Sequence, residues 1–351
     1  MKYPVLILFG PTASGKTHLL NRFLNSAKSI SAKIVSPEIV SADSMQVYKG
    51  MDIGTAKPSK EEREKIPHHL IDIKDPDEQF NAGEFVRLAE KACTEIAGKG
   101  SLPIVSGGTG FYIKNLVEGM TNTPPSDINI RNSLIEELAL KGASSLMEEL
   151  QKADPISAAR IHINDEYRLL RALEVFRLTG QPLSSFPSPW SKTGNNENTV
   201  KKHESPGFYI RGNFRFLLIG LRRNREELYK RINERTSAMF KAGLAEEVKS
   251  LYEKNYTPGD PGLRAIGYRE FFVENLDKTV KGKDAWHFSI DYEGVEKLIA
   301  QNSRRYAKRQ ITFFSSLPCV NWIDMEEGVA ADAAAVSQIN KLLEKNPVMM
   351  I

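Results

Sequence analysis

Cysteine is almost absent from this 351-residue chain, which contains only Cys93 and Cys319. Two cysteines so far apart in the sequence can build neither a disulfide framework nor a cysteine-based zinc site. Long apolar runs are also lacking, since none approaches the roughly 18 residues that a membrane-spanning helix needs. The short apolar run near the N-terminus leads directly into a glycine-rich segment, which is not the pattern of a cleaved signal peptide. We therefore expect a reduced, cytoplasmic protein with no membrane partner.

The chain has no large excess of charge of one sign. It contains 48 basic and 44 acidic residues, so its formal net charge is +4. This mild excess is compatible with a polyanionic partner but does not indicate one by itself. Hydrophobic residues make up 41% of the chain and charged residues 26%, as in folded proteins. The length allows two domains, or one large domain that carries an insertion.

A phosphate-binding motif follows the apolar run Val5–Phe9, which we expect to form a buried strand. The motif fits G-x-x-x-x-G-K-[ST], and apolar residues at helical spacing come after it. Its glycines let backbone N–H groups turn toward an anion, and the helix N-terminus adds a positive dipole end. Lys16 would supply a cation and Thr17 a hydroxyl for Mg²⁺. The sequence thus predicts a pyrophosphate-binding loop made of Gly10, Pro11, Thr12, Ala13, Ser14, Gly15, Lys16 and Thr17.

Short apolar runs alternate with helical patterns in the first part of the chain. We expect further strands at 39–42, 103–106 and 216–221, and a helix at 82–97. Strands that alternate with helices favour a parallel sheet. Together with the phosphate-binding motif, this pattern predicts an α/β fold with a P-loop NTPase-like parallel sheet core.

The stretch from about 121 to 179 differs, because it contains only helical patterns and begins with the helix-start signal Thr-Pro-Pro-Ser-Asp. A flexible loop is expected at 184–213, which is rich in Ser, Pro, Asn and Gly. After the strand at 216–221 the chain is predicted to be mostly helical. We expect a P-loop core made of residues 1–120 and 210–320. A helical insertion is expected at 121–209, and a C-terminal tail or helix at 321–351.

An aspartate, Asp43, stands where the second predicted strand ends. In open α/β sheets this edge carries the chemistry. An aspartate there can hold Mg²⁺, often through water, or accept a proton from the acceptor substrate. It can also simply cap a following helix. These alternatives remain open on the residues alone.

Some nearby polar residues favour structural interpretations. Lys57 precedes Pro58 and is typical of a solvated charge in a loop. The adjacent His68 and His69 lack the cysteine or carboxylate spacing of a zinc site, so we expect no metal there. Three aspartates that follow are predicted to form turns, namely Asp72, Asp75 and Asp77.

Two arginines, Arg231 and Arg235, lie four residues apart on a helix expected at 226–240, and hence on one face. They could close over phosphate groups. The alternative is a solvated helix face on which Glu227 and Glu234 are their partners. Apolar residues mark the buried stripe of this helix, namely Leu228, Ile232 and Met239.

The residues after Asp43 read Ser-Met-Gln-Val-Tyr-Lys-Gly-Met-Asp-Ile-Gly-Thr-Ala-Lys-Pro. This block resembles the family of bacterial tRNA dimethylallyltransferases, also called tRNA isopentenyltransferases, and it is far more particular than the phosphate loop. Further blocks resemble the same family, and they occur in the family's order over nearly the whole chain. The matching segments are 10–17, 43–58, 67–72, 107–114, 160–165, 168–175, 265–270 and 306–310.

The resemblance implies a prenyl transfer. Such enzymes move a dimethylallyl group from dimethylallyl diphosphate to N6 of adenosine 37, immediately 3′ of the anticodon, in tRNAs that read codons starting with U. Pyrophosphate leaves. The phosphate loop would then hold a prenyl diphosphate, with Mg²⁺ at Thr17, and the partner would be a tRNA anticodon stem-loop. We expect a monomer.

The resemblance also implies roles for individual residues. Asp43 would be the base, Thr17 and Arg231 would be catalytic, and Arg231 with Arg235 would clamp the pyrophosphate. Ser44 and Gln46 could orient the adenine, which must be extruded from the anticodon loop. The implied tRNA contacts lie in the predicted insertion and in three other blocks, and comprise Asp43, Ser44, Met45, Gln46, Thr109, Arg131, Tyr167, Arg168, Leu169, Leu170, Arg171, Arg264, Ala265, Ile266, Gly267, Tyr268 and Arg269. Two i, i+4 pairs add a basic stripe, formed by Arg304, Arg305, Lys308 and Arg309.

Two positions depart from the family pattern. Phe80-Asn81 replaces the usual Tyr-Ser, and Phe313-Phe314 is followed by Ser315 where a basic residue is usual. Three other functions remain open. These are a small-molecule kinase that binds ATP, an enzyme that prenylates free AMP, and an RNA-binding module without catalysis.

Overall fold

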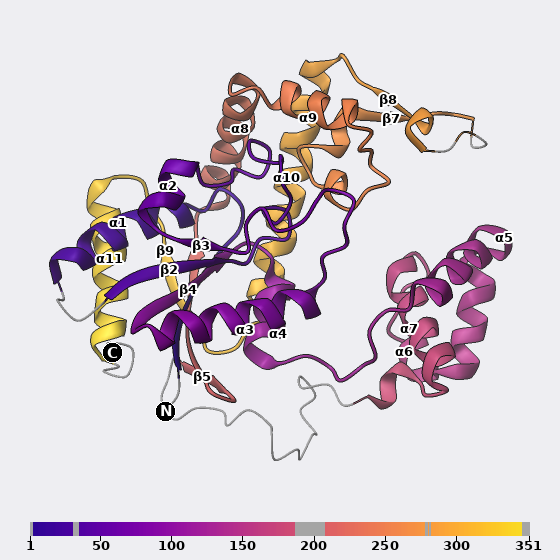
Figure 1. The fold of residues 1–351 in the computed structure, drawn as a ribbon, viewed down its shortest axis with the longest axis horizontal. Helices are drawn as coiled ribbons and strands as arrows, with labels where there is room; N and C mark the ends of the chain where they lie inside the picture. The colour runs from indigo at the N-terminus through magenta and orange to yellow at the C-terminus, as the bar shows by residue number, and fades with distance from the viewer. Residues whose placement is uncertain (1–2, 31–34, 187–207, 278–279, 281, 346–351) are drawn as a thin grey trace. The chain divides into compact units, whose positions relative to one another are not determined.

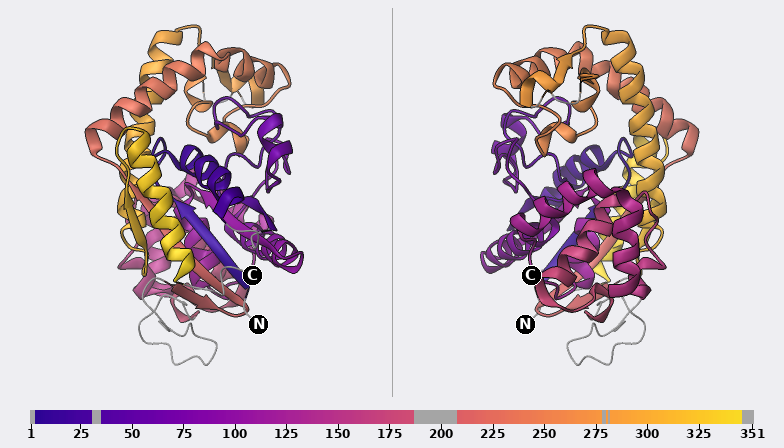
Figure 2. Two further views of the ribbon diagram at one scale, coloured as in Figure 1. Left: turned by 90° about the vertical axis from the view of Figure 1, so that its left-hand side faces the viewer. Right: turned by 90° about the vertical axis from the view of Figure 1, so that its right-hand side faces the viewer.

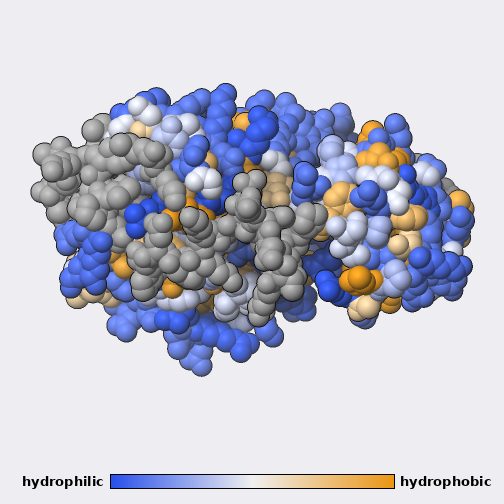
Figure 3. All heavy atoms as spheres, turned by 90° about the horizontal axis from the view of Figure 1, so that it is seen from below, coloured by the Kyte–Doolittle hydropathy of each residue, from blue (hydrophilic) through white to orange (hydrophobic). Residues whose placement is uncertain are grey.

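The computed structural model describes residues 3–30, 35–186, 208–277, 280 and 282–345 (Figure 1). It divides into two compact units. The larger one combines both ends of the chain, residues 1–117 with 200–351, and the smaller one comprises 118–199. None of the described helices has the length and apolarity that a membrane crossing requires. On the face seen in Figure 3, hydrophilic residues predominate and hydrophobic ones occur in small groups.

A seven-stranded sheet forms the centre of the larger unit, in the order β3-β2-β4-β1-β6-β5, with β9 also paired to β6. All neighbours are parallel except β5 and β6. The register sets Leu6 of β1 beside Ile104 and Ile7 beside Leu218. This confirms the predicted parallel α/β core. The strands are β1 (Tyr3–Phe9), β2 (Val35–Ser41), β3 (His68–His69), β4 (Ser101–Gly107), β5 (Phe208–Arg211), β6 (Phe214–Arg222) and β9 (Asn321–Asp324).

Helices cover both faces of the sheet, and the alternation along β1 shows why. Ile7 points into one apolar cluster and Leu6 into the other, because successive strand residues face opposite sides. The first cluster is closed by α3 (Ala82–Gly98) and α4 (Gly110–Glu118), and the second by α1 (Lys16–Ile30) and α11 (Val329–Glu344). Figures 1 and 2 show α11 beside α1. A strand that is covered on both faces needs consecutive apolar residues, as Val5–Phe9 of β1 has.

Three strands of this sheet lie where the sequence predicts none, and the shortest of them is β3. Strand β5 falls inside the expected loop 184–213 and pairs with β6 through a tight turn at Gly212, whose φ is +54°. Strand β9 begins at Asn321, in the expected tail, and extends the sheet next to β6. The sequence does not predict β5 and β9, because each strand is only four residues long and gains its stability from pairing with β6. Most of that expected loop, 187–207, lies outside the described residues.

A third apolar cluster sits beyond the carboxyl ends of the strands. It joins the segment after β2, around Val47 and Met51, to Leu244, Tyr268 and Phe271. The surrounding elements are α2 (Lys60–Lys65), α8 (Arg225–Lys241), α9 (Leu244–Glu253), α10 (Tyr292–Phe314), the hairpin β7 (Phe272–Glu274) and β8 (Trp286–Phe288), and the short 3₁₀ turns η2 (Gly262–Arg264), η3 (Arg269–Phe271) and η4 (Gly282–Ala285). The hairpin is an exception within the C-terminal part, which was predicted to be mostly helical. This cluster builds a second wall opposite the sheet edge.

The smaller unit is helical, as predicted. It contains α5 (Ile128–Ala153), α6 (Pro155–Ala158), α7 (Glu166–Thr179) and the turn η1 (Leu183–Ser185). Asp127 caps α5 by accepting N–H bonds from Asn129 and Ile130. The carboxylate of Glu174 is fully buried and receives Arg171 at 3.0 Å together with the backbone N–H of Asp127 at 2.9 Å. A buried charge needs such partners, so Glu174 joins α7 to the start of α5.

Leu150→Ala should destabilise the helical unit by about 2–5 kcal/mol, because it removes a fully buried side chain from the contact between α5 and α7. Leu140→Ala is the control, since the Leu140 side chain is 84% exposed, although it lies before the kink at Gly142 that divides α5. Urea unfolding followed by circular dichroism would measure both variants. Equal free energies of unfolding for the two variants would contradict this description of the core.

Candidate active site

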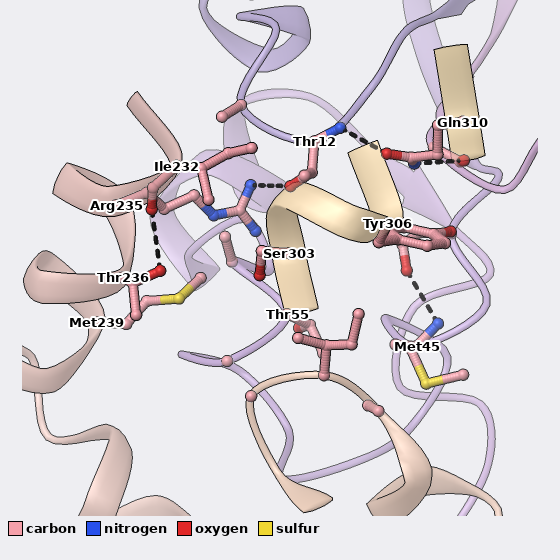
Figure 4. Close-up of a pocket in the computed structure, with 18 of the residues that line it drawn as sticks. Thr12, Met45, Thr55, Ile232, Arg235, Thr236, Met239, Ser303, Tyr306 and Gln310 are labelled. Carbon is pink, nitrogen blue, oxygen red and sulfur yellow. Dashed lines mark hydrogen bonds between the residues drawn. The ribbon is translucent and has the colours of Figure 1, made fainter. Parts of the chain in front are cut away.

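A cavity of about 590 Å³ lies in the larger unit, beside the carboxyl ends of the strands. Its walls come from the phosphate loop, the segment after β2, helices α8 and α10, and the turn at 264–267. Figure 4 shows Arg235 and Met239 facing the cavity from α8, and Tyr306 and Gln310 from α10. Segments from distant parts of the sequence thus form one site.

The phosphate loop has the predicted strand–loop–helix context, between β1 and α1. Gly15 adopts a φ of +100°, which favours glycine, and a Cβ atom on Gly10 would lie 2.8 Å from the Ser14 Oγ. The Ser14 hydroxyl is buried and has no hydrogen-bond partner in the described part of the chain. An orphaned donor at this position suits a loop that receives an anion.

Lys16 folds back over this loop. Its Nζ donates to the carbonyl oxygens of Gly10 at 2.9 Å and Pro11 at 3.0 Å. Burial, followed by the nearby charge of Arg235, lowers the pKa of Lys16 to about 8, whereas Asp43 opposes the shift. The ammonium is therefore held where little negative charge compensates for its burial.

Arg231 and Arg235 reach the phosphate loop from α8. The Arg231 Nε donates to the Ala13 carbonyl at 3.1 Å, and the Arg235 Nη1 donates to the Thr12 Oγ1 at 3.2 Å (Figure 4). Burial lowers the pKa of Arg235, and the charge of Asp43 partly offsets this shift. The sequence correctly placed both side chains on one face of the helix, and that face is turned to the loop.

The alternative of a solvated face with glutamate partners is wrong. Glu227 pairs instead with Arg223, and Glu234 lies 4.0 Å from Lys230. Arg223 is a cation that sequence reasoning missed. Only 4% of its side chain is exposed, and its Nε lies 3.5 Å from the Ser14 carbonyl. Its position directly after β6 was the available signal, because parallel strands bring their carboxyl ends to one edge.

Asp43 follows the end of β2 by two residues and lines the same cavity. Its Oδ1 accepts the backbone N–H of Met45 at 2.9 Å, which is an Asx-type turn. No helix follows within the described segment 42–59, so the helix-cap alternative is wrong. The backbone N–H of Ser44 donates to the Thr109 Oγ1 at 3.0 Å, which brings the turn after β4 to the same place. Four of the predicted residues, Asp43, Ser44, Met45 and Gln46, line the cavity.

Two residues of α10, Tyr306 and Gln310, complete the floor of the site and were assigned no role from the sequence. The Thr12 N–H donates to the Gln310 Oε1 at 2.9 Å, and the Gln310 Nε2 donates to the Gly108 carbonyl at 2.7 Å. Burial raises the pKa of Tyr306 to about 12, and Asp43 adds to the shift, so its phenol stays neutral. Their i, i+4 spacing within a basic helix was the only local signal.

The segment after Asp43 is anchored by a buried lysine. Only 1% of the Lys57 side chain is exposed, and its Nζ lies 2.6 Å from Asp72 and 2.5 Å from Asp52. The interpretation of Lys57 as a solvated charge was therefore wrong, and Asp72 does more than form a turn. Burial opposes ionisation of Asp72, but hydrogen bonds from Lys57 and Arg63 prevail, so the pKa of Asp72 is lowered.

Several residues expected to contact tRNA are part of the protein core. Leu169 and Leu170 are buried within the helical unit, and Tyr268 is fully buried in the larger unit. These predictions were wrong, because a matching sequence block contains inward-facing residues as well as exposed ones. The cavity wall instead includes other members of the set, namely Arg264, Ala265, Ile266 and Gly267. Arg269 is exposed but does not line the cavity.

Some of the residues expected to contact tRNA are exposed on the helical unit. Tyr167 is 71% exposed, and the guanidinium of Arg131 lies 4.9 Å from its ring centre. Arg168 is 72% exposed and lies 3.1 Å from Asp165, whereas Arg171 is held by Glu174. The unit therefore presents a cation–aromatic pair and a largely solvated arginine at its surface.

Side chains that could hold Mg²⁺ line the cavity. Thr17 and Asp43 both line it, and Mg²⁺ in phosphate sites needs only one or two protein oxygens beside phosphate and water. Among the described residues, no group of three or more His, Cys, Asp or Glu could hold a metal. The donor set therefore fits a Mg²⁺ that arrives with a diphosphate. The two histidines of β3 have other partners, since His68 contacts the Ile66 carbonyl and His69 contacts Glu38, both at 2.7 Å.

Comparison with known proteins assigns the family. The family model described as IPP transferase matches residues 46–317. A tRNA dimethylallyltransferase of Geobacter sulfurreducens is 41% identical over 92% of each chain, and one of Geobacillus kaustophilus is 42% identical over 97% of this chain and 96% of its own. The crystal structure of a tRNA isopentenylpyrophosphate transferase from Bacillus halodurans is 34% identical and covers 98% of both chains, with a TM-score of 0.61. This chain therefore belongs to the IPP transferase family.

Proposed function

We propose that the protein transfers a dimethylallyl group from dimethylallyl diphosphate to N6 of the adenosine immediately 3′ of the anticodon, in tRNAs that read codons starting with U. The observation that carries the proposal is that a phosphate loop, buried arginines and an aspartate at a strand end line a single cavity. The prenylation of tRNA follows from the family and its named relatives.

The diphosphate is bound at the phosphate loop. The side chains of Lys16, Arg231 and Arg235 donate there to carbonyl and hydroxyl oxygens of the loop. Negative charge grows on the leaving pyrophosphate as its C–O bond breaks, and fixed cations stabilise such charge without reorganisation. A Mg²⁺ held through Thr17 would neutralise further phosphate charge. A kinase would need a separate role for Asp43 and Gln46, for which the site gives no reason.

The dimethylallyl group is taken up by the apolar part of the cavity. Ile232 and Met239 of α8 line it, together with Ile266 and Ile299. These side chains lie next to the arginines and can exclude water from the reacting carbon. Water exclusion favours transfer to the amine over hydrolysis.

Asp43 accepts the proton of the adenine amine. Its Oδ1 is engaged by the Met45 N–H, which leaves Oδ2 to face the substrate. An exocyclic amine is a weak nucleophile, so a positioned base accelerates its attack. Gln46 and Ser44 line the same cavity and orient the adenine by hydrogen bonds, and Thr109 holds Ser44 from behind. The neutral phenol of Tyr306 lines the same cavity as a further donor.

Transfer RNA has to present an extruded base to this cavity. Extrusion costs a few kcal/mol, which contacts to phosphates and stacking on aromatic residues offset. Candidate contacts are Arg131, Tyr167 and Arg168 of the helical unit, Arg264 and Arg269, and the stripe Arg304, Arg305, Lys308 and Arg309 on α10. We further propose that the protein acts as a cytoplasmic monomer.

The reaction can be tested with purified protein, Mg²⁺ and radiolabelled dimethylallyl diphosphate, with either unmodified tRNA or AMP as the acceptor. Asp43→Asn should lower kcat for tRNA by about 100-fold or more, because a general base contributes that much. Binding of inorganic pyrophosphate, measured by calorimetry, should persist because the phosphate loop is intact. Asp77→Asn is the matched control, since Asp77 is exposed and lies outside the cavity.

Each contrary outcome of this assay has a definite meaning. If the label appeared only in AMP, the acceptor would be a free nucleotide and not tRNA. Hydrolysis of ATP, added in a parallel reaction, without prenyl transfer in the main assay would mean that the loop binds ATP. Full activity of Asp43→Asn would show that Asp43 is not the general base.

Affinity for pyrophosphate should fall as the pH rises through about 8, by up to about tenfold per pH unit. The lowered pKa leaves Lys16 uncharged above that pH, whereas an anion binds only to the charged form. Lys16→Arg keeps its positive charge over this pH range, so any pH dependence of its affinity comes from the titration of pyrophosphate itself. The difference in pH dependence between the two proteins therefore measures the titration of Lys16. A parallel pH dependence in both proteins would contradict the assignment.

The lowered pKa of Lys16 also affects the stability of the free protein, which should rise with pH whereas the affinity for pyrophosphate falls. The unfolded chain keeps the Lys16 proton up to the ordinary lysine pKa of 10.5, whereas the folded chain loses it near 8. The unfolded state therefore binds more protons in this window, so the contribution of Lys16 to the free energy of unfolding rises with pH.

A further inference from the structure

One carboxylate, that of Glu247 on α9, holds the segment after Asp43 at its far end. The Glu247 Oε2 accepts the backbone N–H groups of Asp52 at 2.9 Å and Ile53 at 2.8 Å. Its Oε1 accepts the N–H of Gly54 at 3.2 Å and the hydroxyl of Tyr268 at 2.6 Å. We call this arrangement of the Glu247 carboxylate, the three N–H groups and the Tyr268 hydroxyl the Glu247 latch.

The latch requires close approach of the chain to Tyr268. A Cβ atom on Gly54 would lie 2.4 Å from the Tyr268 ring, so only glycine fits there. Tyr268 is fully buried, and burial followed by the charge of Glu247 raises its pKa well above the usual value. The phenol therefore stays a neutral donor to the carboxylate throughout the ordinary pH range.

The latch continues directly into the cavity wall. Gly54, Thr55 and Ala56 line the cavity beside Gln46. The Gln46 Nε2 lies 3.4 Å from the carbonyl oxygens of both Thr55 and Ala56, and the Ser41 Oγ donates to the Gln46 Oε1 at 2.9 Å. The side-chain amide of Gln46 is thus oriented at one end by β2 and at the other by the latched backbone.

We infer that Glu247 is a positioning residue for the acceptor adenosine, which acts through the latched backbone of 52–56 on Gln46 and on the cavity wall beside Asp43. This inference rests on the proposed function of the site. The diphosphate end is positioned by other elements, because the phosphate loop is joined to α8 through Arg231 and to α10 through Gln310. Loss of the latch should therefore impair use of the acceptor and spare binding of the diphosphate.

Helix α9 does not need Glu247 for its own packing. Its buried face consists of Leu244, Ala245, Val248 and Leu251. Glu247 lies beside that face, and both of its carboxylate oxygens bind another segment of the chain. A variant at this position should therefore release the 52–56 backbone and leave the helix in place.

The decisive experiment compares Glu247→Ala with Glu246→Ala, which changes the exposed neighbour on the same turn of α9. In Glu247→Ala we expect kcat/KM for tRNA to fall about 10- to 100-fold, because a displacement of about 1 Å in a positioning group has effects of that size. The dissociation constant for inorganic pyrophosphate should be unchanged in both variants. Glu246→Ala should match the wild type in both measurements.

Partial variants keep the test decisive if Glu247→Ala folds poorly. Glu247→Gln retains one acceptor oxygen, and Tyr268→Phe leaves the whole Glu247 carboxylate in place, so the loss of kcat/KM should be graded from Ala to Gln to Phe. Hydrogen exchange followed by mass spectrometry should show faster exchange at the amides of 52–54 in the same order. A structural role alone would lower pyrophosphate affinity together with tRNA use.

The outcomes separate this inference from the proposed function. Wild-type protein that transfers label to no tRNA would refute the proposed function. Active wild type with an equally active, faster-exchanging Glu247→Ala would overturn the positioning role and leave the function standing. Parallel loss of tRNA use and pyrophosphate binding would also overturn it, because the two ends of the cavity would then share one support.

Discussion

Buried positive charge around the phosphate loop is the constraint on which the site depends. Lys16, Arg231 and Arg235 face carbonyl and hydroxyl oxygens of the loop. Burial lowers the pKa of Lys16 and of Arg235, the charge of Arg235 adds to the shift at Lys16, and Asp43 only partly offsets both shifts. Like charges stay together only where packing holds them. An anion that binds here favours the charged state of these groups, and their mutual repulsion therefore contributes to the affinity for the diphosphate.

The packing that holds these charges comes mainly from α8 and α10. Leu228 and Ile232 are buried on the face of α8 that adjoins the arginines. Phe314 near the end of α10 is fully buried and lies 4.8 Å, centre to centre, from the ring of Phe9 at the end of β1. One turn earlier, Gln310 bonds the loop and the turn after β4. The phosphate loop is therefore fixed to two helices from the C-terminal part of the chain.

Those parts of the fold and site that depend on short-range patterns could be predicted from the sequence. The phosphate loop, the strand before it and the shared face of Arg231 and Arg235 follow from spacings of a few residues. Contacts between distant residues could not be predicted, since Thr12 and Gln310 are separated by 298 positions and Asp52 and Glu247 by 195. Single-sequence patterns also do not tell which residues of a matching block face inward. The errors at Leu169, Leu170 and Tyr268 arose in this way.

The two substrates of one cavity are positioned by separate supports. The phosphate loop, α8 and α10 hold the cations at the diphosphate end, whereas β2, the Lys57 pairs and the Glu247 latch hold the wall at the acceptor end. Stabilisation of the leaving group and orientation of the attacking amine are distinct requirements of the reaction, and each needs its own rigid geometry. The helices α8, α9 and α10 share the third apolar cluster, but the hydrogen bonds of the two supports involve different residues. Changes at Glu247 can therefore alter the use of the acceptor with little effect on the binding of the prenyl donor.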